Sequence, residues 1–277
     1  MKLISAILRL VPVALLFVGA VPLRAQSFQT LNSWDVATYF PITAPCNGVD
    51  GNFYGTTELS SGLPSLGSGF GAVYQVTPQG GFKIIHAFGY ALTPTNGLVQ
   101  GTDGFFYGTT GSGGSNSAGT LYKVGADGTF ASLLDFATTT ASNPAAALAA
   151  GTDGNFYGTT RQGGTAGTGV FFKVTPAGQY TLLQSFSTAT GHTPRGRLLR
   201  GSDGNFYGTA NAGGTNGTGT VFKATPAGVI SVLCHFPASG VVNPQSGLTL
   251  GNDGNFYGLT GAVAFRVTPL GDRKSVV

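Results

Sequence analysis

A segment of ten residues recurs along this chain at nearly constant spacing, and it limits the possible folds more than any other feature. Its clearest copy is Gly151–Thr160, in which Asp-Gly precedes Asn-Phe-Tyr-Gly-Thr-Thr. The steps between successive copies are 53, 50, 50 and 50 residues. A fixed period of this length is typical of repeat architectures, in which stacked units bury their apolar faces against one another as one domain. The repeated aspartates are Asp50, Asp103, Asp153, Asp203 and Asp253.

Each repeat divides into four predicted strands separated by turns. A short first strand surrounds a leucine five residues before the aspartate, such as Leu148, and a proline such as Pro144 precedes it. The Asp-Gly turn leads into a second strand at 155–160, because Asp and Gly favour tight turns. A Gly-Gly loop, a third strand at 169–174 and a Thr-Pro-x-Gly turn follow. The fourth strand ends on an aromatic residue, at Phe88, Phe136, Phe186 and Phe236.

The adjacent aromatic residues of the second strand indicate how the strands are covered. Successive strand residues point to opposite faces, so Phe156 and Tyr157 bury both faces of their sheet. Small sheets covered on both sides are typical of the β-propeller, and we predict an all-β propeller of about five four-stranded blades. A parallel β-solenoid is the structural alternative, although its coils are usually shorter and poorer in hairpin turns.

The first 25 residues have the pattern of a secretory signal peptide. Lys2 and Arg9 are followed by an apolar run from Leu10 to Leu23, and a small residue, Ala25, lies before Gln26. A membrane anchor is the alternative, but Arg9, Pro12 and Pro22 interrupt the run that a spanning helix needs. We therefore expect residues 1–25 to be removed, residues 26–271 to form the propeller, and the protein to be secreted or displayed at the cell surface, with no membrane span in the mature chain.

Both ends of the predicted propeller depart from the repeat. Residues 28–34 resemble a fourth strand without the rest of its repeat, whereas 272–277 lack the aromatic residue that should end the last one. We expect the strand at 28–34 to pair beside 262–267, which would complete the fifth blade and cover an exposed edge. Residues 272–277 are expected to be a tail that is not native to the protein.

Charge and composition exclude one class of partner. Only 9% of the residues are charged, and removal of the leader would leave eleven basic and ten acidic residues. Nucleic-acid binding requires a clustered basic face, so we expect no nucleic-acid partner. We expect a monomer, no cofactor, and an extracellular ligand such as a glycan or a protein.

The repeated aspartates could be metal ligands or catalytic acids, but a role in the turn explains them better. Aspartate before glycine accepts hydrogen bonds from its own turn, and glycine supplies the positive φ. A calcium loop needs several oxygen ligands at alternate positions, and each turn has one carboxylate. No other acids form a recognisable acid and base pair. His86, His192 and His235 are too scattered for a zinc site.

Four residues are our candidates for ligand binding. Arg161, Arg195 and Arg197 belong, with Arg200, to the densest basic group, and we add His192 from a variable loop. Guanidinium groups suit an anionic or sugar ligand. Cys46 and Cys234 fall on an inner strand of the first repeat and an outer strand of the fourth, too far apart for a disulfide, so we expect both to be free and buried.

The repeat resembles the Gloeo/Verruco (GloVer) tandem repeat of exported bacterial proteins. The resemblance rests on Gly-x-Asp-Gly-Asn-Phe-Tyr-Gly-Thr-Thr, the Gly-Gly pair, and Gly-Thr-Val-Phe-Lys-Val-Thr-Pro-x-Gly, over about residues 28–271. It implies an exported propeller but no particular activity. The repeat is also similar to that of streptogramin-lyase-like propellers, whose chemistry relies on a histidine and a glutamate near a metal. Glu58 is the only glutamate of this chain, so the lyase activity is not transferred.

Function is expected at the variable loops, which should gather at one end of the blades, opposite the uniform turns. Variable loops on a rigid scaffold are common binding sites. The leading expectation is a non-enzymatic binding or cell-surface module, with no catalytic residues. The alternative is a propeller hydrolase or lyase acting on an extracellular carbohydrate or small molecule.

Overall fold

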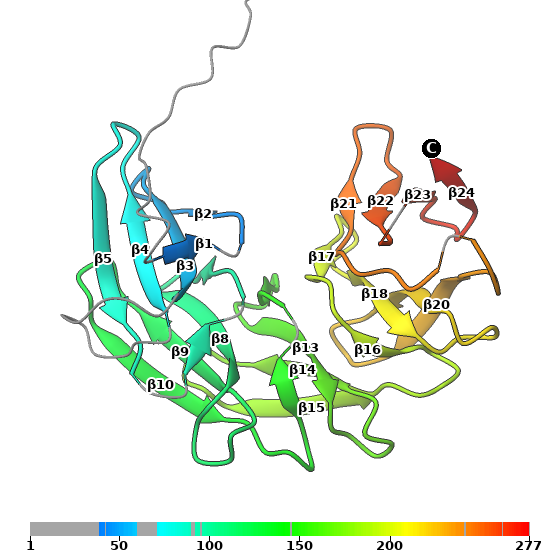
Figure 1. Cartoon of the computed structure of the whole chain (residues 1–277), viewed down its shortest axis with the longest axis horizontal. Coiled ribbons are helices and arrows are strands. Elements are labelled where there is room, and N and C mark those ends of the chain that lie inside the picture. Colours follow the sequence, from blue (N-terminus) through cyan, green and yellow to red (C-terminus); the bar gives the residue numbers. More distant parts are fainter. Residues whose placement is uncertain are drawn as a thin grey trace, which may run out of the picture. The chain divides into compact units, whose positions relative to one another are not determined.

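The computed structural model describes residues 39–41, 43–59, 71–89, 92–94, 96–144, 146–240, 242–261 and 263–276. The chain separates into residues 1–30 and a compact unit of residues 31–277, to which all described elements belong. Every regular element among them is a β-strand, and the strands form five antiparallel sheets in chain order, from blue to red in Figure 1. The all-β prediction is therefore confirmed, and the leader predicted at 1–25 lies outside the described residues.

Each sheet corresponds to one repeat and is called a blade. Blade 1 contains β1 (Tyr39–Pro41), β2 (Cys46–Asn47), β3 (Phe53–Leu59), β4 (Ala72–Val76) and β5 (Phe82–Ala87). Blade 2 contains β6 (Thr93–Pro94), β7 (Val99–Gln100), β8 (Phe106–Ser112), β9 (Thr120–Val124) and β10 (Phe130–Asp135). Blade 3 contains β11 (Ser142–Pro144), β12 (Ala149–Ala150), β13 (Phe156–Gln162), β14 (Val170–Val174) and β15 (Tyr180–Ser185). Blade 4 contains β16 (His192–Pro194), β17 (Leu199–Arg200), β18 (Phe206–Ala212), β19 (Thr220–Ala224) and β20 (Ile230–His235). Blade 5 contains β21 (Thr249–Leu250), β22 (Phe256–Leu259), β23 (Ala264–Val267) and β24 (Arg273–Val276).

The first strand of blades 1 to 4 is split into two short pieces. In blade 3, β11 and β12 both pair with β13, at its opposite ends. The leucine around which we predicted a short strand, Leu148, lies between these pieces and is 3% exposed. Successive first strands contact one another, β2 with β7, β7 with β12, and β12 with β17. We call this edge of each blade its inner edge.

A glycine in the second strand makes room for the third strand's aromatic ring. A Cβ atom at Gly158 would lie 2.5 Å from Cζ of Phe172, and one at Gly208 would lie 2.5 Å from Cζ of Phe222. These distances are far inside van der Waals contact, so any larger residue would displace a ring that is fully buried. Packing therefore explains why glycine follows Phe-Tyr in the repeat.

Four clusters of buried side chains form the core, and each one joins two consecutive blades. The tyrosine of the second strand packs on the phenylalanine of the next blade, with 4.3 Å between the ring centroids of Tyr157 and Phe206. The aromatic residue that follows the fourth strand packs on the third strand of the next blade, with 5.0 Å between the ring centroids of Phe186 and Phe222. Burial of both sheet faces is thus confirmed. The tyrosine pairs are Tyr54–Phe106, Tyr107–Phe156, Tyr157–Phe206 and Tyr207–Phe256.

Three residues that precede the repeated proline have a left-handed backbone. Asn143, Thr193 and Asn243 have φ angles of 55°, 55° and 53°. This conformation is uncommon for residues other than glycine. Each backbone N–H donates to a carbonyl of the preceding blade, as from Thr193 to Thr168 over 3.0 Å. The left-handed residue therefore links the start of one blade to the loop of its neighbour.

The last blade differs from our prediction. Residues Arg273–Val276 form β24 and pair with β23, so they occupy the edge at which we expected residues 28–34. The segment 28–34 lies outside the described residues. Backbone pairing needs no particular side chain, which explains how a sequence without the terminal aromatic residue can form this strand.

The two cysteines were predicted correctly in one respect and wrongly in another. Both are free, on β2 and β20 as expected, but each is partly exposed rather than buried. Both belong to strands at the edge of a blade, where a neighbouring blade covers the side chain less completely than at its centre.

An arginine cluster as the candidate functional site

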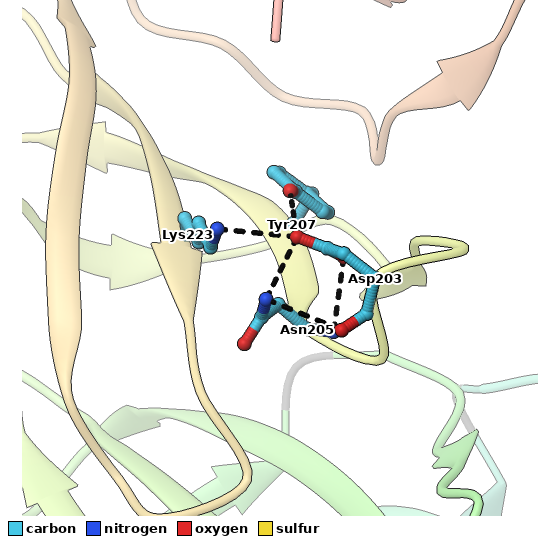
Figure 2. A network of polar contacts seen from close by, with 4 residues as sticks. All are labelled: Asp203, Asn205, Tyr207 and Lys223. Carbon is cyan, nitrogen blue, oxygen red and sulfur yellow. Dashed lines mark hydrogen bonds and ion pairs between the residues drawn. The ribbon is translucent and has the colours of Figure 1, made fainter. Parts of the chain in front are cut away.

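The repeated aspartates are fully engaged in their own turns. In blade 4, the carboxylate of Asp203 accepts hydrogen bonds from the backbone N–H of Asn205 at 3.1 Å, the Asn205 side chain at 2.7 Å and the Tyr207 hydroxyl at 2.7 Å. Lys223 adds an ion pair at 3.1 Å, as Figure 2 shows. The turn glycine, Gly204, has a φ of 76°. The structure therefore supports the turn interpretation of the aspartates over a metal or catalytic one.

These hydrogen bonds stabilise the charged form of the aspartates. At Asp203 burial acts to raise the pKa, but the bonds from Asn205 and Tyr207 outweigh it and the pKa is lowered. At Asp253 the bonds from Asn255 and Tyr257 lower the pKa to about 2. Burial, together with the hydrogen bond to Asp203, raises the pKa of Tyr207 to about 12. A carboxylate with such a low pKa is a poor general base at neutral pH.

Two further aspartates and two histidines also have structural roles. Asp127 accepts hydrogen bonds from Thr129 in a further turn, and Asp135 accepts one from the backbone N–H of Ser115. In blade 4 the imidazole of His235 accepts the corresponding hydrogen bond, from the backbone N–H of Thr215, and so takes the place of the Asp135 carboxylate. His86 stacks on Phe130 with 3.8 Å between ring centroids. Within the described ranges, no group of three or more His, Cys, Asp or Glu side chains could hold a metal ion.

Arg161 and Arg195 come from neighbouring blades and lie close to each other. Arg161 is near the end of β13 in blade 3, and Arg195 follows β16 in blade 4. Burial, followed by the charge of Arg195, lowers the pKa of Arg161. The Nε atom of Arg161 is buried and has no hydrogen-bond partner among the described residues. The structure therefore brings together two of the four predicted binding residues, as a pair of like charges.

Arg197 and Arg200 extend the positive charge along the inner edge of blade 4. Both side chains are exposed, as is that of Arg195. The charge of Arg197 acts on the Cys46 thiol of blade 1, whose pKa burial nevertheless raises. We call Arg161, Arg195, Arg197 and Arg200 the arginine cluster.

The cluster is specific to blades 3 and 4, although the backbone there repeats that of the other blades. Counting from each repeated aspartate, uncharged residues replace Arg197 and Arg200 in every other repeat. The replacements for Arg197 are Ala44, Gly97, Ala147 and Gly247, and those for Arg200 are Asn47, Gln100, Ala150 and Leu250. The arginines are therefore not needed to build an inner edge.

No described carboxylate compensates the cluster. The single ion pair found among the described residues is that of Lys223 with Asp203, and it includes none of these arginines. Guanidinium groups donate paired, planar hydrogen bonds that match carboxylate and phosphate oxygens. An unpaired group of them is chemically suited to hold an anion.

His192 does not join the arginines through any contact found in the structure. It lies on β16, and its Nδ1 atom is 3.2 Å from Oγ1 of the adjacent Thr193. A Cβ atom at Gly213 would lie 3.0 Å from Cδ2 of His192, so the imidazole packs on the Gly-Gly loop of its own blade. The prediction that His192 belongs to the same site therefore stays a prediction.

A separate depression of about 570 Å³ lies at the opposite edge of blade 4 and contains none of the cluster arginines. It is open to solvent, and its exposed surface is mostly apolar. We consider the cluster the better candidate because its groups are charged and unpaired. The depression is lined by Thr188, Ala189, Thr190, Gly214, Thr215, Val232 and His235.

Comparison with known proteins agrees with the class that the sheets define, a β-propeller built from tandem repeats. The family model described as Gloeobacter/Verrucomicrobia repeat matches residues 28–264. The chain belongs to this family, and the resemblance seen in the sequence is confirmed. No curated protein sequence matches the chain.

Solved structures with the same fold include gluconolactonases and an extracellular domain of a one-component system. A periplasmic gluconolactonase of Pseudomonas aeruginosa has a TM-score of 0.56 at 18% identity, with 84% of this chain and 70% of that chain covered. A gluconolactonase of Xanthomonas campestris has a TM-score of 0.50 at 13% identity, with 86% of each chain covered. The extracellular domain of a one-component system of B. thetaiotaomicron has a TM-score of 0.54 at 14% identity, with 88% and 33% covered. At these identities the likeness establishes the fold alone.

Proposed function

We propose that this protein is an exported, non-enzymatic binding module that uses the arginine cluster to hold an anionic ligand, in particular a saccharide that carries a carboxylate. The observation that carries this proposal is the proximity of Arg161 and Arg195 without a described carboxylate partner. Like charges repel, and a bound carboxylate would relieve that repulsion while accepting the N–H groups of both side chains. The leader-like N-terminus and the periplasmic and extracellular propellers of similar fold support export.

The test compares a charged sugar with its neutral counterpart. Sodium glucuronate should bind in isothermal titration calorimetry and glucose should not, and the affinity should fall as salt is added because screening weakens charge attraction. Loss of both guanidinium groups in the variant Arg161→Gln with Arg195→Gln should weaken binding by about tenfold or more, the scale of charge-assisted hydrogen bonds.

Lys173→Gln is the matched control, since it removes one positive charge from the third strand of blade 3 and leaves the cluster intact. Its affinity for glucuronate should equal that of the unchanged chain. Equal binding of glucuronate and glucose, or full binding by the double variant, would show that the cluster is not the site.

A second candidate is hydrolysis of a sugar lactone, which the likeness to two gluconolactonases favours. Opening a lactone with water gives a hydroxy acid, so the arginine cluster would then face a product that carries a carboxylate. Hydrolysis of gluconolactone should be followed against its spontaneous rate, with and without added divalent metal. Metal-dependent turnover that is lost in Glu58→Gln or His192→Ala would replace the binding role with an enzymatic one.

A further inference from the structure

Consecutive blades meet through the same kind of residues, but the boundary between blades 3 and 4 differs from the others in its polar contacts. In blades 1 to 4 a threonine lies two residues after the tyrosine of the second strand, so both point to the face that the next blade covers. These threonines are only 0 to 3% exposed. A buried hydroxyl without a hydrogen bond costs free energy, so the partner of each threonine affects how firmly the blades hold together. The four residues are Thr56, Thr109, Thr159 and Thr209.

Three of these threonines have a hydrogen-bond partner, and the one in blade 3 does not. Thr209 of blade 4 donates to the carbonyl of Ser246 in blade 5 at 2.8 Å. The hydroxyl of Thr159 is buried without a partner among the described residues. By the count of the repeat, the acceptor that corresponds to Ser246 is Gly196, which lies between the cluster residues Arg195 and Arg197. The other two bonds, both of 2.9 Å, are from Thr56 to the carbonyl of Asn96 and from the Asn96 side chain to Thr109.

The same boundary has a second unpaired group, two residues further along β13. In blade 4, the side chain of Asn211 donates to the carbonyl of Pro244 in blade 5 at 3.2 Å. Arg161 occupies the corresponding position of blade 3, and its buried Nε atom has no partner among the described residues. Thr159 and Arg161 are alternate residues of one strand, so they point to the same face. Two unpaired polar groups therefore lie side by side where blade 3 meets blade 4.

Charge further distinguishes this boundary from the next one. Burial, followed by the charge of Arg195, lowers the pKa of Arg161, which means that two like charges act on each other between blades 3 and 4. The corresponding residues of blades 4 and 5 are Asn211 and Gln245, which are uncharged. The aromatic contact of this boundary is retained, since Tyr157 stacks on Phe206. The difference is therefore confined to the polar end of β13.

We infer that the boundary between blades 3 and 4 is weaker than those on either side of it, and that the anionic ligand of the arginine cluster strengthens it. The effect of the ligand rests on the proposed function. A bound carboxylate offsets the repulsion between Arg161 and Arg195 and accepts hydrogen bonds from both blades. A ligand that binds the closed form of a boundary better than the open form shifts the equilibrium toward the closed form. Ligand binding is thus coupled to the local stability of the propeller.

One backbone hydrogen bond at each boundary provides a matched set of reporters. The donors are the N–H groups of Asn143, Thr193 and Asn243, which bond to the preceding blade over 2.8 to 3.0 Å at the boundaries of blades 2 and 3, 3 and 4, and 4 and 5. Amide hydrogen exchange of the full chain, followed by NMR and corrected for intrinsic rates, should be about fivefold faster at Thr193, the ratio that one net hydrogen bond gives. Sodium glucuronate should slow exchange at Thr193 alone, and glucose should change none of the three.

Removal of the hydroxyl from two equivalent threonines should have opposite effects. Thr159→Val removes a buried group that has no partner, so exchange at Thr193 should become slower in the absence of ligand. Thr209→Val is the matched control, because it leaves the carbonyl of Ser246 unpaired, and exchange at Asn243 should become faster. This comparison needs no ligand, so it tests the weak boundary independently of the proposed function.

Arg161→Asn tests the second unpaired group and the coupling to the ligand together. It introduces the residue that blade 4 has at this position, Asn211, which bonds to the next blade. Exchange at Thr193 should become slower without ligand, and glucuronate should have no further effect.

Three results would each overturn the inference. Equal protection of the three reporters in the unliganded chain, or unchanged or faster exchange at Thr193 in Thr159→Val, would show that the boundary is not weak and would leave the proposed function intact. Glucuronate that binds in calorimetry without slowing exchange at Thr193 would show that binding is not coupled to the boundary. Failure of glucuronate to bind at all would instead overturn the proposed function, and with it the strengthening by the ligand.

Discussion

The Asp-Gly turns and the arginine cluster are both polar regions built on the same repeat, but they differ in how their charges are satisfied. The carboxylate of Asp153 accepts hydrogen bonds from Asn155 and Tyr157 of its own turn, and the arrangement recurs in other blades. Arg161 and Arg195 occur once and have no described carboxylate partner. We infer that polar residues found in every repeat, such as the aspartates, maintain the fold. Charged residues found in one repeat, such as Arg161 and Arg195, are available to bind a ligand.

The largest expected effect comes from removal of a repeated aromatic ring. Phe206→Ala should lower the free energy of unfolding by about 3 to 5 kcal/mol, because the ring is 0% exposed between Tyr157 and Phe171 of the preceding blade. Chemical denaturation of the purified chain measures the change. An unchanged midpoint would mean that the contacts between blades do not stabilise the fold.

Loss of a turn carboxylate should have a smaller effect. Asp153→Ala removes an acceptor from the backbone and side chain of Asn155 and from Tyr157, and it should cost about 1 kcal/mol, the net value of a typical hydrogen bond. Arg197→Ala is the comparison, and its unfolding free energy should change by no more than about 0.5 kcal/mol. If Arg197→Ala destabilised the chain more than Asp153→Ala, it would be wrong that the aspartates maintain the fold and that the arginines do not.

The smallest expected effect is a loss of folding stability at acidic pH. The folded pKa of Asp253 is about 2, lowered from 3.8 by Asn255 and Tyr257, so the unfolded state takes up its proton first as the pH falls. Its contribution to stability is therefore complete above about pH 4 and is lost as the pH falls toward 2. Thermal unfolding of the chain and of Asp253→Asn across this range measures it. The variant should show a shallower loss, and identical slopes would contradict the assigned hydrogen bonds.

Sequence reasoning was most successful where one local pattern has one physical solution. Asp before Gly specifies a turn, and adjacent Phe156 and Tyr157 require that both faces of a strand be covered. The period of 50 residues then leaves stacked blades as the arrangement that buries them all. Free cysteines on distant strands followed from the same strand assignment.

The less successful predictions concern residues whose environment depends on other blades. The sequence predicted a short first strand around Leu148, but the structure has two pieces, and Leu148 lies between them with its side chain in the core shared by blades 2 and 3. The burial of Cys46 was overestimated because a strand assignment does not say how far a neighbouring blade extends over an edge.

The sequence alone therefore determined the fold class, the turns, the residues of the core and the list of candidate arginines, since all of these depend on spacing and side-chain chemistry within one repeat. Only the tertiary structure decided that Arg161 and Arg195 lie together across two blades, that His192 packs on its own loop, and that β24 pairs with β23. The physical reason is distance along the chain. Three strands, β14, β15 and β16, separate Arg161 from Arg195 along the chain, and only the packing of blade 3 on blade 4 brings their charges near each other.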